Sequence, residues 1–234
     1  MDQAISLGAK DQSAAKISFN PIRLQHVTVP DDWCFIIADS GEVAEKSGSL
    51  QFEYNLRRAK CEEAFRVIST NLLKQGITEG LHESYPELCA SLDTEILLYF
   101  AEKLLPETEH RCFRHVVTEA GRVEAAVERM LAADIRGFGD YMNASHDSLK
   151  TDYQVSTEVL DELVQVARDG GAVGARLTGA GFGGCVVALA ERRRTRDVLG
   201  ALRAEYYERR GRKNQMDEHL FIAVPSRGAS VQVI

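Results

Sequence analysis

The chain has 234 residues, which is enough for one large domain, or for one domain and part of another. Hydrophobic residues make up 44% of it and charged residues 27%, as in an ordinary soluble globular protein. The formal net charge of -7 repels the phosphates of nucleic acid, which argues against a general nucleic-acid-binding role. The sequence has no apolar run near the ~18 residues that a membrane-spanning helix needs, so we expect no membrane contact.

The cysteines are odd in number, widely spaced and without a Cys-x-x-Cys pair: Cys34, Cys61, Cys89, Cys112 and Cys185. This pattern disfavours a disulfide framework or a zinc site, and it favours buried free thiols in a reducing compartment. The first residues have neither the basic start nor the long apolar stretch of a signal peptide. We therefore expect a cytoplasmic location.

Strands are predicted near the start of the chain. Two short ones, Lys16–Phe19 and Arg23–Val29, flank a turn at Asn20 and Pro21. The continuous apolar run Trp33–Ala38 is typical of a buried strand. The small and polar residues 41–50 then predict a loop.

Helices are predicted over the middle of the chain, where apolar residues recur at i, i+3 and i+4. The first begins near Phe52, the second covers Glu87–Leu104, the third has its apolar face between Val116 and Met130, and the fourth covers Asp134–Leu149. We expect Ser156 to cap a fifth helix, because Glu158 then lies in a first turn where the helix dipole favours negative charge. Gly170 and Gly171 end that helix.

Strands return in the last third of the chain. Ala172–Thr178 and Cys185–Ala190 flank a glycine run, a helix follows over Arg194–Arg209, and Leu220–Val224 and Ser230–Ile234 are closing strands. Helices and a few strands in one compact unit predict an α+β fold with helices packed on a small sheet. An arginine cluster follows the second of these strands, and we expect it to be a solvated helix face and not a phosphate-binding patch. It consists of Arg192, Arg193, Arg194 and Arg196.

The glycine run reads T-G-A-G-F-G-G-C-V from Thr178 to Val186. Its glycines satisfy G-x-G-x-x-G, but a dinucleotide-binding turn needs a helix directly afterwards, and here a strand follows. The protein-kinase glycine loop needs further motifs that the chain lacks. The remaining interpretation is a glycine-rich turn between two strands. Glycines in such a turn allow positive φ and a close approach of the backbone to a ligand or to another loop. The residues alone leave a ligand-binding turn and a ligand-free hairpin equally open.

The segment Gly174–Cys185, G-A-R-L-T-G-A-G-F-G-G-C, resembles the third signature motif of the GHMP kinases, in the form closest to galactokinases. Further segments agree in the same order, at Met1–Gln3, Glu53–Glu62, Arg114–Val117 with Glu119, and Ser145–Ser156. The resemblance therefore extends over essentially the whole chain. It implies a two-layer α+β fold of helices on a small antiparallel sheet, the ferredoxin-like C-terminal domain of the family, over residues 32–234. Residues 1–31 would be a remnant of the N-terminal domain.

By this resemblance, the chain derives from an ATP-dependent kinase that phosphorylates galactose or a related sugar at its C1 hydroxyl. Asp2 aligns with the catalytic aspartate, whose carboxylate can accept the proton of the attacking hydroxyl. Tyr54 aligns with a tyrosine that contacts the sugar. The loop near the nucleotide phosphates and the sugar would consist of Gly179, Gly181, Gly183 and Gly184. Without the resemblance, Asp2 would be a frayed terminal residue and Tyr54 a half-buried aromatic residue at a helix start.

Other polar residues in the matching segments have no chemistry that the resemblance assigns. For Asp39, His115, His146 and Asp152 we expect structural hydrogen bonding or helix capping. They lack the spacing of a metal site such as H-E-x-x-H, so no metal ligand is predicted in this chain.

Two family motifs are not found in the sequence: the Gly-Glu-His signature for sugar recognition and the Gly-Leu-Ser-Ser-Ser loop that cradles ATP phosphates and helps hold Mg²⁺. ATP and Mg²⁺ are therefore implied for the full enzyme, with the phosphate loop and metal ligands outside this chain. We expect the chain to be incomplete alone, with a small sugar and the N-terminal domain in trans as candidate partners. The alternatives are a non-catalytic sugar-sensing or regulatory module, and another GHMP kinase that phosphorylates a different sugar at C1.

Overall fold

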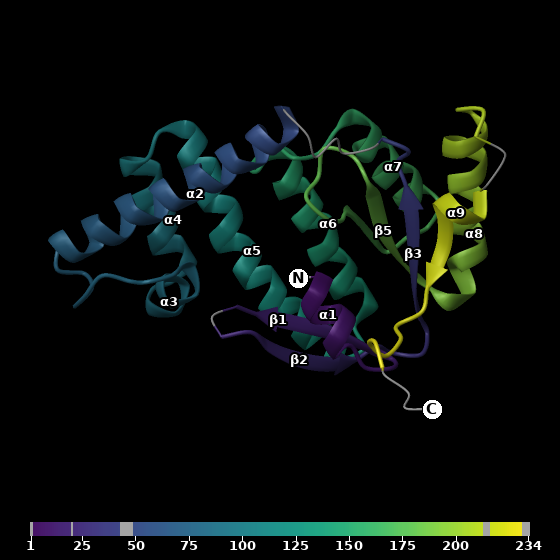
Figure 1. The fold of residues 1–234 in the computed structure, drawn as a ribbon, viewed down its shortest axis with the longest axis horizontal. Helices are drawn as coiled ribbons and strands as arrows, with labels where there is room; N and C mark the ends of the chain where they lie inside the picture. The colour runs from purple at the N-terminus through teal and green to yellow at the C-terminus, as the bar shows by residue number, and fades with distance from the viewer. Residues whose placement is uncertain (1, 20, 43–48, 213–215, 231–234) are drawn as a thin grey trace.

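The computed structural model describes residues 2–19, 21–42, 49–212 and 216–230 (Figure 1). It confirms the α+β class and the small antiparallel sheet. Within the described residues, a four-stranded sheet has the order β4-β5-β3-β6 and a separate hairpin joins β1 to β2. The strands are β1 (Ser13–Ser18), β2 (Arg23–Thr28), β3 (Trp33–Asp39), β4 (Gly174–Leu177), β5 (Cys185–Glu191) and β6 (Leu220–Ala223).

The helices surround these sheets on several sides. They are α1 (Asp2–Gly8), α2 (Ser49–Lys74), α3 (Tyr85–Ser91), α4 (Thr94–Leu104), α5 (Glu107–Leu131), α6 (Ile135–Thr151), α7 (Glu158–Asp169), α8 (Thr195–Ala201) and α9 (Met216–His219). Figure 1 shows α2, α3 and α4 together at one end, α7 and α8 beside the four-stranded sheet at the other, and α5 and α6 between them. No helix in the described ranges is both long and apolar enough to span a membrane.

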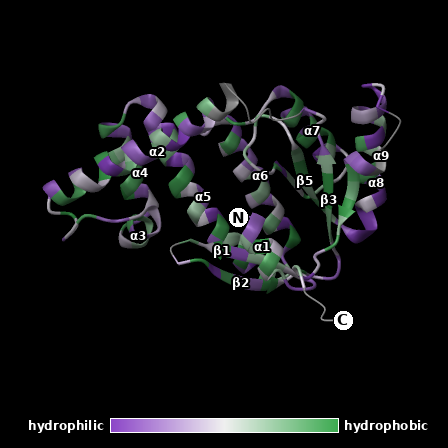
Figure 2. Cartoon of the chain, viewed as in Figure 1, coloured by the Kyte–Doolittle hydropathy of each residue, from purple (hydrophilic) through white to green (hydrophobic). Residues whose placement is uncertain are grey.

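The four-stranded sheet has β3 and β5 at its centre. Ile36 lies opposite Ala188 on one side and Ile222 on the other. Alternation along β3 directs Ile36 into the core formed with α7 and α8, and Trp33 into a second core formed with α6. Figure 2 shows that hydrophobic residues dominate β3 and β5, which explains why their apolar runs were recognisable as buried strands.

The outer edge of β4 is closed by side chains in place of a further strand. The Asn143 side-chain amide on α6 accepts from Ala175 N at 3.0 Å and donates to Val173 O at 3.2 Å. Arg168 on α7 donates to Ala175 O at 3.1 Å. These contacts satisfy backbone groups that a sheet edge otherwise leaves to solvent, so the strand that leads into the glycine run is firmly placed.

The helical end has its own core. Ala64, Ile68 and Leu72 on α2 are fully buried, which confirms the predicted apolar face. The single predicted helix Glu87–Leu104 is wrong, because the backbone is extended at Leu92 and a new helix begins at Thr94. This break lets both short helices bury a leucine in the same core.

Several predicted boundaries need correction. Thr157 caps α7, with its Oγ1 accepting from Leu160 N, whereas the predicted cap Ser156 donates to Asp161. The predicted last helix consists of a 3-10 turn, the short α8 and a π-helical segment over Leu202–Glu208. The first strand begins at Ser13 and not at Lys16. The predicted turn residue Asn20 and most of the predicted strand Ser230–Ile234 lie outside the described residues.

Two expectations about side chains are confirmed. All five cysteines are free thiols; Cys34, Cys61 and Cys112 are buried as expected, whereas Cys89 and Cys185 are only half-buried. The arginine cluster is exposed: Arg193 pairs with Glu191 and Arg194 with Asp197, as on an ordinary solvated surface.

The β1–β2 hairpin lies between α1 and α5. His26 contacts the carbonyl of Gly8 on one side, and Lys16 pairs with Glu124 of α5 on the other. A cavity of about 290 Å³ lies between the hairpin, α5, α6 and the four-stranded sheet. β2 and β3 belong to different sheets, and a domain boundary near residue 31 stays a prediction.

Candidate functional site

The glycine loop, Thr178–Gly184, joins β4 to β5. Gly179, Gly181 and Gly184 have φ of 83°, 80° and 83°, and Phe182 has the left-handed φ of 59°. Its amides at Thr178, Phe182 and Gly184 donate to backbone carbonyls. Within the described residues, the other loop amides have no acceptor, namely those of Gly179, Ala180, Gly181 and Gly183. Successive amides of this kind can hold the oxygens of an anion such as phosphate.

Two other segments hold the loop. At one end, Ser40 N donates to Gly184 O and Gly184 N donates to Glu42 O, both at 2.9 Å. In the middle, Phe182 N donates to Val155 O at 2.7 Å. A methyl group on Gly181 would lie 2.3 Å from that carbonyl, so this glycine is required by close approach as well as by its φ.

Tyr54 lies near the start of α2 and is 44% exposed. One turn later, Arg57 Nε donates to Tyr153 O at 3.0 Å, which attaches this part of α2 to the turn that also contacts the glycine loop. Burial raises the pKa of Tyr153, and the neighbouring Cys61 and Tyr54 raise it further. The structure therefore attaches α2, through Arg57, and the glycine loop, through Phe182, to the same turn, Asp152–Val155.

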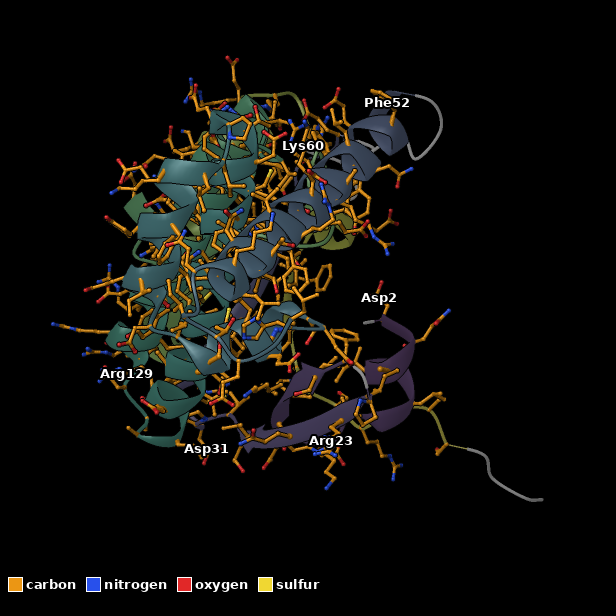
Figure 3. All side chains as sticks on the ribbon, turned by 90° about the vertical axis from the view of Figure 1, so that its left-hand side faces the viewer. Asp2, Arg23, Asp31, Phe52, Lys60 and Arg129 are labelled. Carbon is orange, nitrogen blue, oxygen red and sulfur yellow. The ribbon has the colours of Figure 1, made fainter. Side chains whose placement is uncertain are left out.

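Asp2 is exposed at the start of α1. Figure 3 shows it at the tip of that helix, well away from Lys60 of α2. Within the described part of the chain, Asp2 has no hydrogen-bond or ion-pair partner. The structure thus does not bring Asp2 into contact with Tyr54 or with the glycine loop.

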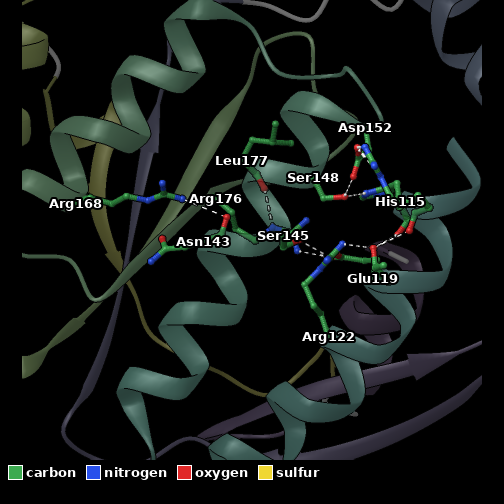
Figure 4. Close-up of polar contacts among 12 residues, drawn as sticks. His115, Glu119, Arg122, Asn143, Ser145, Ser148, Asp152, Arg168, Arg176 and Leu177 are labelled. Carbon is green, nitrogen blue, oxygen red and sulfur yellow. Dashed lines mark hydrogen bonds and ion pairs between the residues drawn. The ribbon is translucent and has the colours of Figure 1, made fainter. Parts of the chain in front are cut away.

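A chain of buried polar contacts connects α5 to α6 below the Asp152–Val155 turn (Figure 4). His115 Nδ1 and Ser148 Oγ are 3.0 Å apart, and Ser148 donates to Asp152 Oδ2 at 2.9 Å. Arg114 donates to the other oxygen of Asp152. Burial lowers the pKa of His115 to about 4, so the imidazole is neutral at pH 7.

A second set of contacts leads into the glycine loop from below. Glu119 of α5 accepts from Arg122, Ser145 and Arg176. The hydrogen bond from Ser145 and the charges of the arginines hold the pKa of Glu119 below its usual range, against the opposing effect of burial. Arg176 is two residues before Thr178, so this carboxylate anchors the strand from which the loop begins.

The four residues expected to form structural hydrogen bonds all have polar partners in the structure. Asp39 accepts from Gly41 N at 2.8 Å and pairs with His219 at 2.9 Å, and His146 lies 3.3 Å from Asp161. His115 and Asp152 act as described above. Within the described ranges, no three His, Cys, Asp or Glu side chains gather as a metal site.

Sequence reasoning did not single out Arg57 or Val155 as parts of the site. Arg57 contributes through its guanidinium and Val155 through its backbone carbonyl. Both lie in segments that resemble the family, and this resemblance was the one sequence signal that could have indicated them. Nothing in their spacing indicates that they meet.

Comparisons with known proteins relate the chain to one family of kinases. The GHMP kinases C terminal family matches residues 123–208. A galactokinase from Actinobacillus succinogenes is 33% identical over 230 residues, which are 97% of this chain and 54% of that relative. Residues 123–208 thus form a GHMP kinase C-terminal domain. A galactokinase from Haemophilus influenzae is also 33% identical, over 99% of this chain and 55% of its own length.

The fold of this chain is also similar to a solved structure, the Lactococcus lactis galactokinase complexed with galactose. The TM-score is 0.75 at 28% identity, over 95% of this chain and 52% of that one. The chain thus spans about half the length of the galactokinases it matches. The family match itself includes the Asp152–Val155 turn and the glycine loop, while Tyr54 and Asp2 lie before it.

Proposed function

We propose that this chain supplies part of the active site of a galactokinase-like sugar kinase, which transfers the γ-phosphoryl group of ATP to the C1 hydroxyl of galactose or a related sugar. The observation that carries the proposal is the 33% identity to a galactokinase over 97% of the chain, with the glycine loop and the start of α2 attached to one turn. The cytoplasm, where ATP is available, is the proposed location.

The glycine loop is the part of the site that fits a phosphate or sugar oxygen. Four of its amides have no acceptor among the described residues, and backbone N–H groups with positive-φ geometry are suited to anions. ATP, when bound, supplies the phosphoryl group. The amides of Gly179 and Gly181 would hold oxygen atoms of the nucleotide or of the sugar in place.

Tyr54 and Asp2 have the roles that the resemblance gives them. The exposed hydroxyl end of Tyr54 would hydrogen-bond the sugar and fix its orientation. Asp2 would accept the proton of the C1 hydroxyl as that oxygen attacks phosphorus. The described residues offer no set of oxygen ligands for Mg²⁺, so no step is assigned to a metal held by this chain.

The half of the galactokinases' length that this chain does not match would supply the rest of the site. In that arrangement residues 1–31 belong with the N-terminal domain and residues 32–234 form the C-terminal one. The N-terminal domain is then the protein partner, either in the same polypeptide or in trans.

Galactose binding to the purified chain tests the proposal without requiring turnover. Saturation-transfer NMR should detect galactose on the unmodified chain, and Tyr54→Ala should weaken that signal strongly. Tyr99→Ala is the matched control, since Tyr99 is a comparably exposed tyrosine on α4. Galactose signals that are equal for both variants would contradict the role of Tyr54, and a chain that binds a protein partner but no sugar would favour a regulatory module.

A further inference from the structure

The turn Asp152–Val155 is fixed to three elements through its backbone. Tyr153 N donates to Ser148 O and Val155 N to Leu149 O, both at 3.0 Å, which ties the turn to the end of α6. Arg57 donates to Tyr153 O from α2. Phe182 donates to Val155 O from the glycine loop. A displacement of the turn would therefore also displace α2 at Arg57 and the glycine loop, which are the two parts of the proposed site.

The Asp152 carboxylate holds this turn in place. Asp152 is 9% exposed and accepts from Arg114 Nε at 3.1 Å and from Ser148 Oγ at 2.9 Å. A buried carboxylate needs such partners, and removal of the charge releases them. Next to it, the ring of Tyr153 stacks on His115 at 4.6 Å between centroids, with 24° between the planes. His115 contacts Ser148, which donates to Asp152, and its ring also packs against the residue that follows Asp152.

Among the described residues, two of the four non-glycine residues with left-handed φ lie beside this contact; the other two are Gln12 and Ala133. Gln154 has φ of 56° and Phe182 has φ of 59°, although neither is glycine. Left-handed backbone at such residues persists where the surroundings hold it, and it gathers at functional sites. Both residues lie at the hydrogen bond from Phe182 N to Val155 O. Gln154 directly precedes Val155, and Phe182 is the donor.

We propose that Asp152 is a positioning residue for the sugar-kinase site. Through its ion pair with Arg114 it sets the Asp152–Val155 turn, and the turn sets the conformation of the glycine loop and the attachment of α2 next to Tyr54. The proposal rests on the proposed sugar-kinase function for its biological role, but the exchange experiment below tests it independently of that function. The role is one of positioning, because the buried Asp152 carboxylate is held by Arg114 and Ser148.

The competing explanation is that Asp152 only adds to the general stability of the domain. The loop is also held at Gly184 by Glu42 and by Ser40, and Thr157 Oγ1 donates to the Glu42 side chain at 2.9 Å. If those contacts are sufficient, loss of the Asp152 charge weakens all regions alike. If Asp152 is required, the loop and the start of α2 loosen before the rest of the chain does.

Amide hydrogen exchange of the full 234-residue chain separates the two explanations. Asp152→Asn keeps the shape and removes the charge. We expect at least about tenfold faster exchange of the hydrogen-bonded loop amides of Thr178, Phe182 and Gly184 and of peptides that cover residues 52–58. Exchange in peptides that cover α4 should be unchanged, because local opening is then uncoupled from global unfolding. Glu162→Gln is the control, since Glu162 forms a two-bond ion pair with Arg210 and, among the described residues, has no hydrogen bond to the glycine loop or to the Asp152–Val155 turn. It should leave the exchange of the loop amides unchanged.

Equal acceleration of exchange in α4 and in the glycine loop, or no acceleration in the loop, would overturn the proposal. If Asp152→Asn does not fold, Ser148→Ala provides the milder variant, because it removes one hydrogen bond to Asp152 and the contact to His115. For that variant, the ratio of the exchange rate in the glycine loop to the exchange rate in α4 again distinguishes the two explanations.

Galactose binding distinguishes this proposal from the proposed function. A folded Asp152→Asn variant with a loosened loop should bind galactose at least about tenfold more weakly than Glu162→Gln does, since positioning losses of this kind are large. If the unmodified chain, assembled with the part of a galactokinase that it does not match, binds no galactose while the exchange result holds, the sugar-kinase function fails and the positioning of the loop by Asp152 stands. If galactose binds equally to both variants, Asp152 does not position the site.

Discussion

Glu119 on α5 and Arg176 on β4 form an ion pair, with 3.2 Å between Oε1 and Nη1, at the strand that leads into the glycine loop. Arg122 binds the other carboxylate oxygen at 2.7 Å. One carboxylate therefore neutralises two half-buried guanidinium groups and holds the start of the loop against α5 (Figure 4).

Glu119→Gln should lower the free energy of unfolding by about 2 kcal/mol, because it leaves two guanidinium groups without their counter-charge in a half-buried place. Urea unfolding monitored by circular dichroism measures the loss. Glu124→Gln, one turn further on the same helix and 64% exposed at its side chain, should cost no more than about 0.5 kcal/mol. Equal losses for the two variants would mean that the Glu119 contacts add nothing beyond a surface pair.

The neutral His115 predicts a loss of stability at mildly acidic pH. Its pKa is about 4 in the folded chain, against about 6.5 in an unfolded one, so the unfolded state binds the extra proton between these values. The stabilising contribution is complete above pH 6.5 and falls as the pH is lowered towards 4, by roughly 3 kcal/mol at most. Unfolding free energies measured at pH 7, 6, 5 and 4 should fall less steeply for His115→Gln. The pKa of His146 is also lowered by burial, so some slope should persist; a slope unchanged by His115→Gln would contradict the assignment.

Two glycines of the loop form a natural pair for comparison. Gly179 and Gly181 have almost equal φ, 83° and 80°, but an added methyl group meets nothing within 4 Å at Gly179 and a carbonyl oxygen at 2.3 Å at Gly181. Gly179→Ala should cost about 1 kcal/mol of backbone strain. Gly181→Ala should cost about 3 kcal/mol, because the contact to Val155 must also open. Chemical denaturation distinguishes them, and indistinguishable midpoints would show that the loop is not pressed against Val155.

The strain at Gln154 predicts opposite effects of two substitutions. Gln154→Gly should raise the free energy of unfolding by about 0.5 kcal/mol, because relief of the left-handed backbone outweighs the entropy that glycine gains in the unfolded chain. Gln154→Val should lower it by more than about 1 kcal/mol, because a β-branched residue tolerates this φ least. The side chain is exposed, so packing changes little. Thermal unfolding of the two variants provides the measurement; a destabilised glycine variant would contradict the strain.

Local pattern predicted the elements well where one residue type dominates. The apolar run Trp33–Ala38 is a central strand, and the spacing of Ala64, Ile68 and Leu72 gave the buried face of α2. Caps were less certain: Ser156 and Thr157 are both suitable, and only the choice of hydrogen-bond partner selects Thr157. The helix break at Leu92 has no glycine or proline to mark it.

The candidate site depends on contacts between segments that are distant in the sequence. Hydrophobic periodicity predicts local structure and gives no information about such contacts. Arg57 and Tyr153 are 96 positions apart, and Glu119 and Arg176 are 57 apart. The resemblance selected segments that contain all four residues, but not their pairing. A buried carboxylate such as Asp152 was expected to be structural, and its partners gave it a more specific role.

Phosphoryl transfer that depends on Asp2 is the most direct test of the sugar-kinase proposal. The chain, combined with ATP, Mg²⁺, galactose and the separately purified part of the Actinobacillus succinogenes galactokinase that it does not match, should form a sugar 1-phosphate detectable by ³¹P NMR. Asp2→Asn should lower the rate at least about 100-fold, as expected for loss of a proton acceptor. Sugar phosphate formed at an equal rate by Asp2→Asn, or none formed by the unmodified chain in a complex that has assembled, would contradict the account.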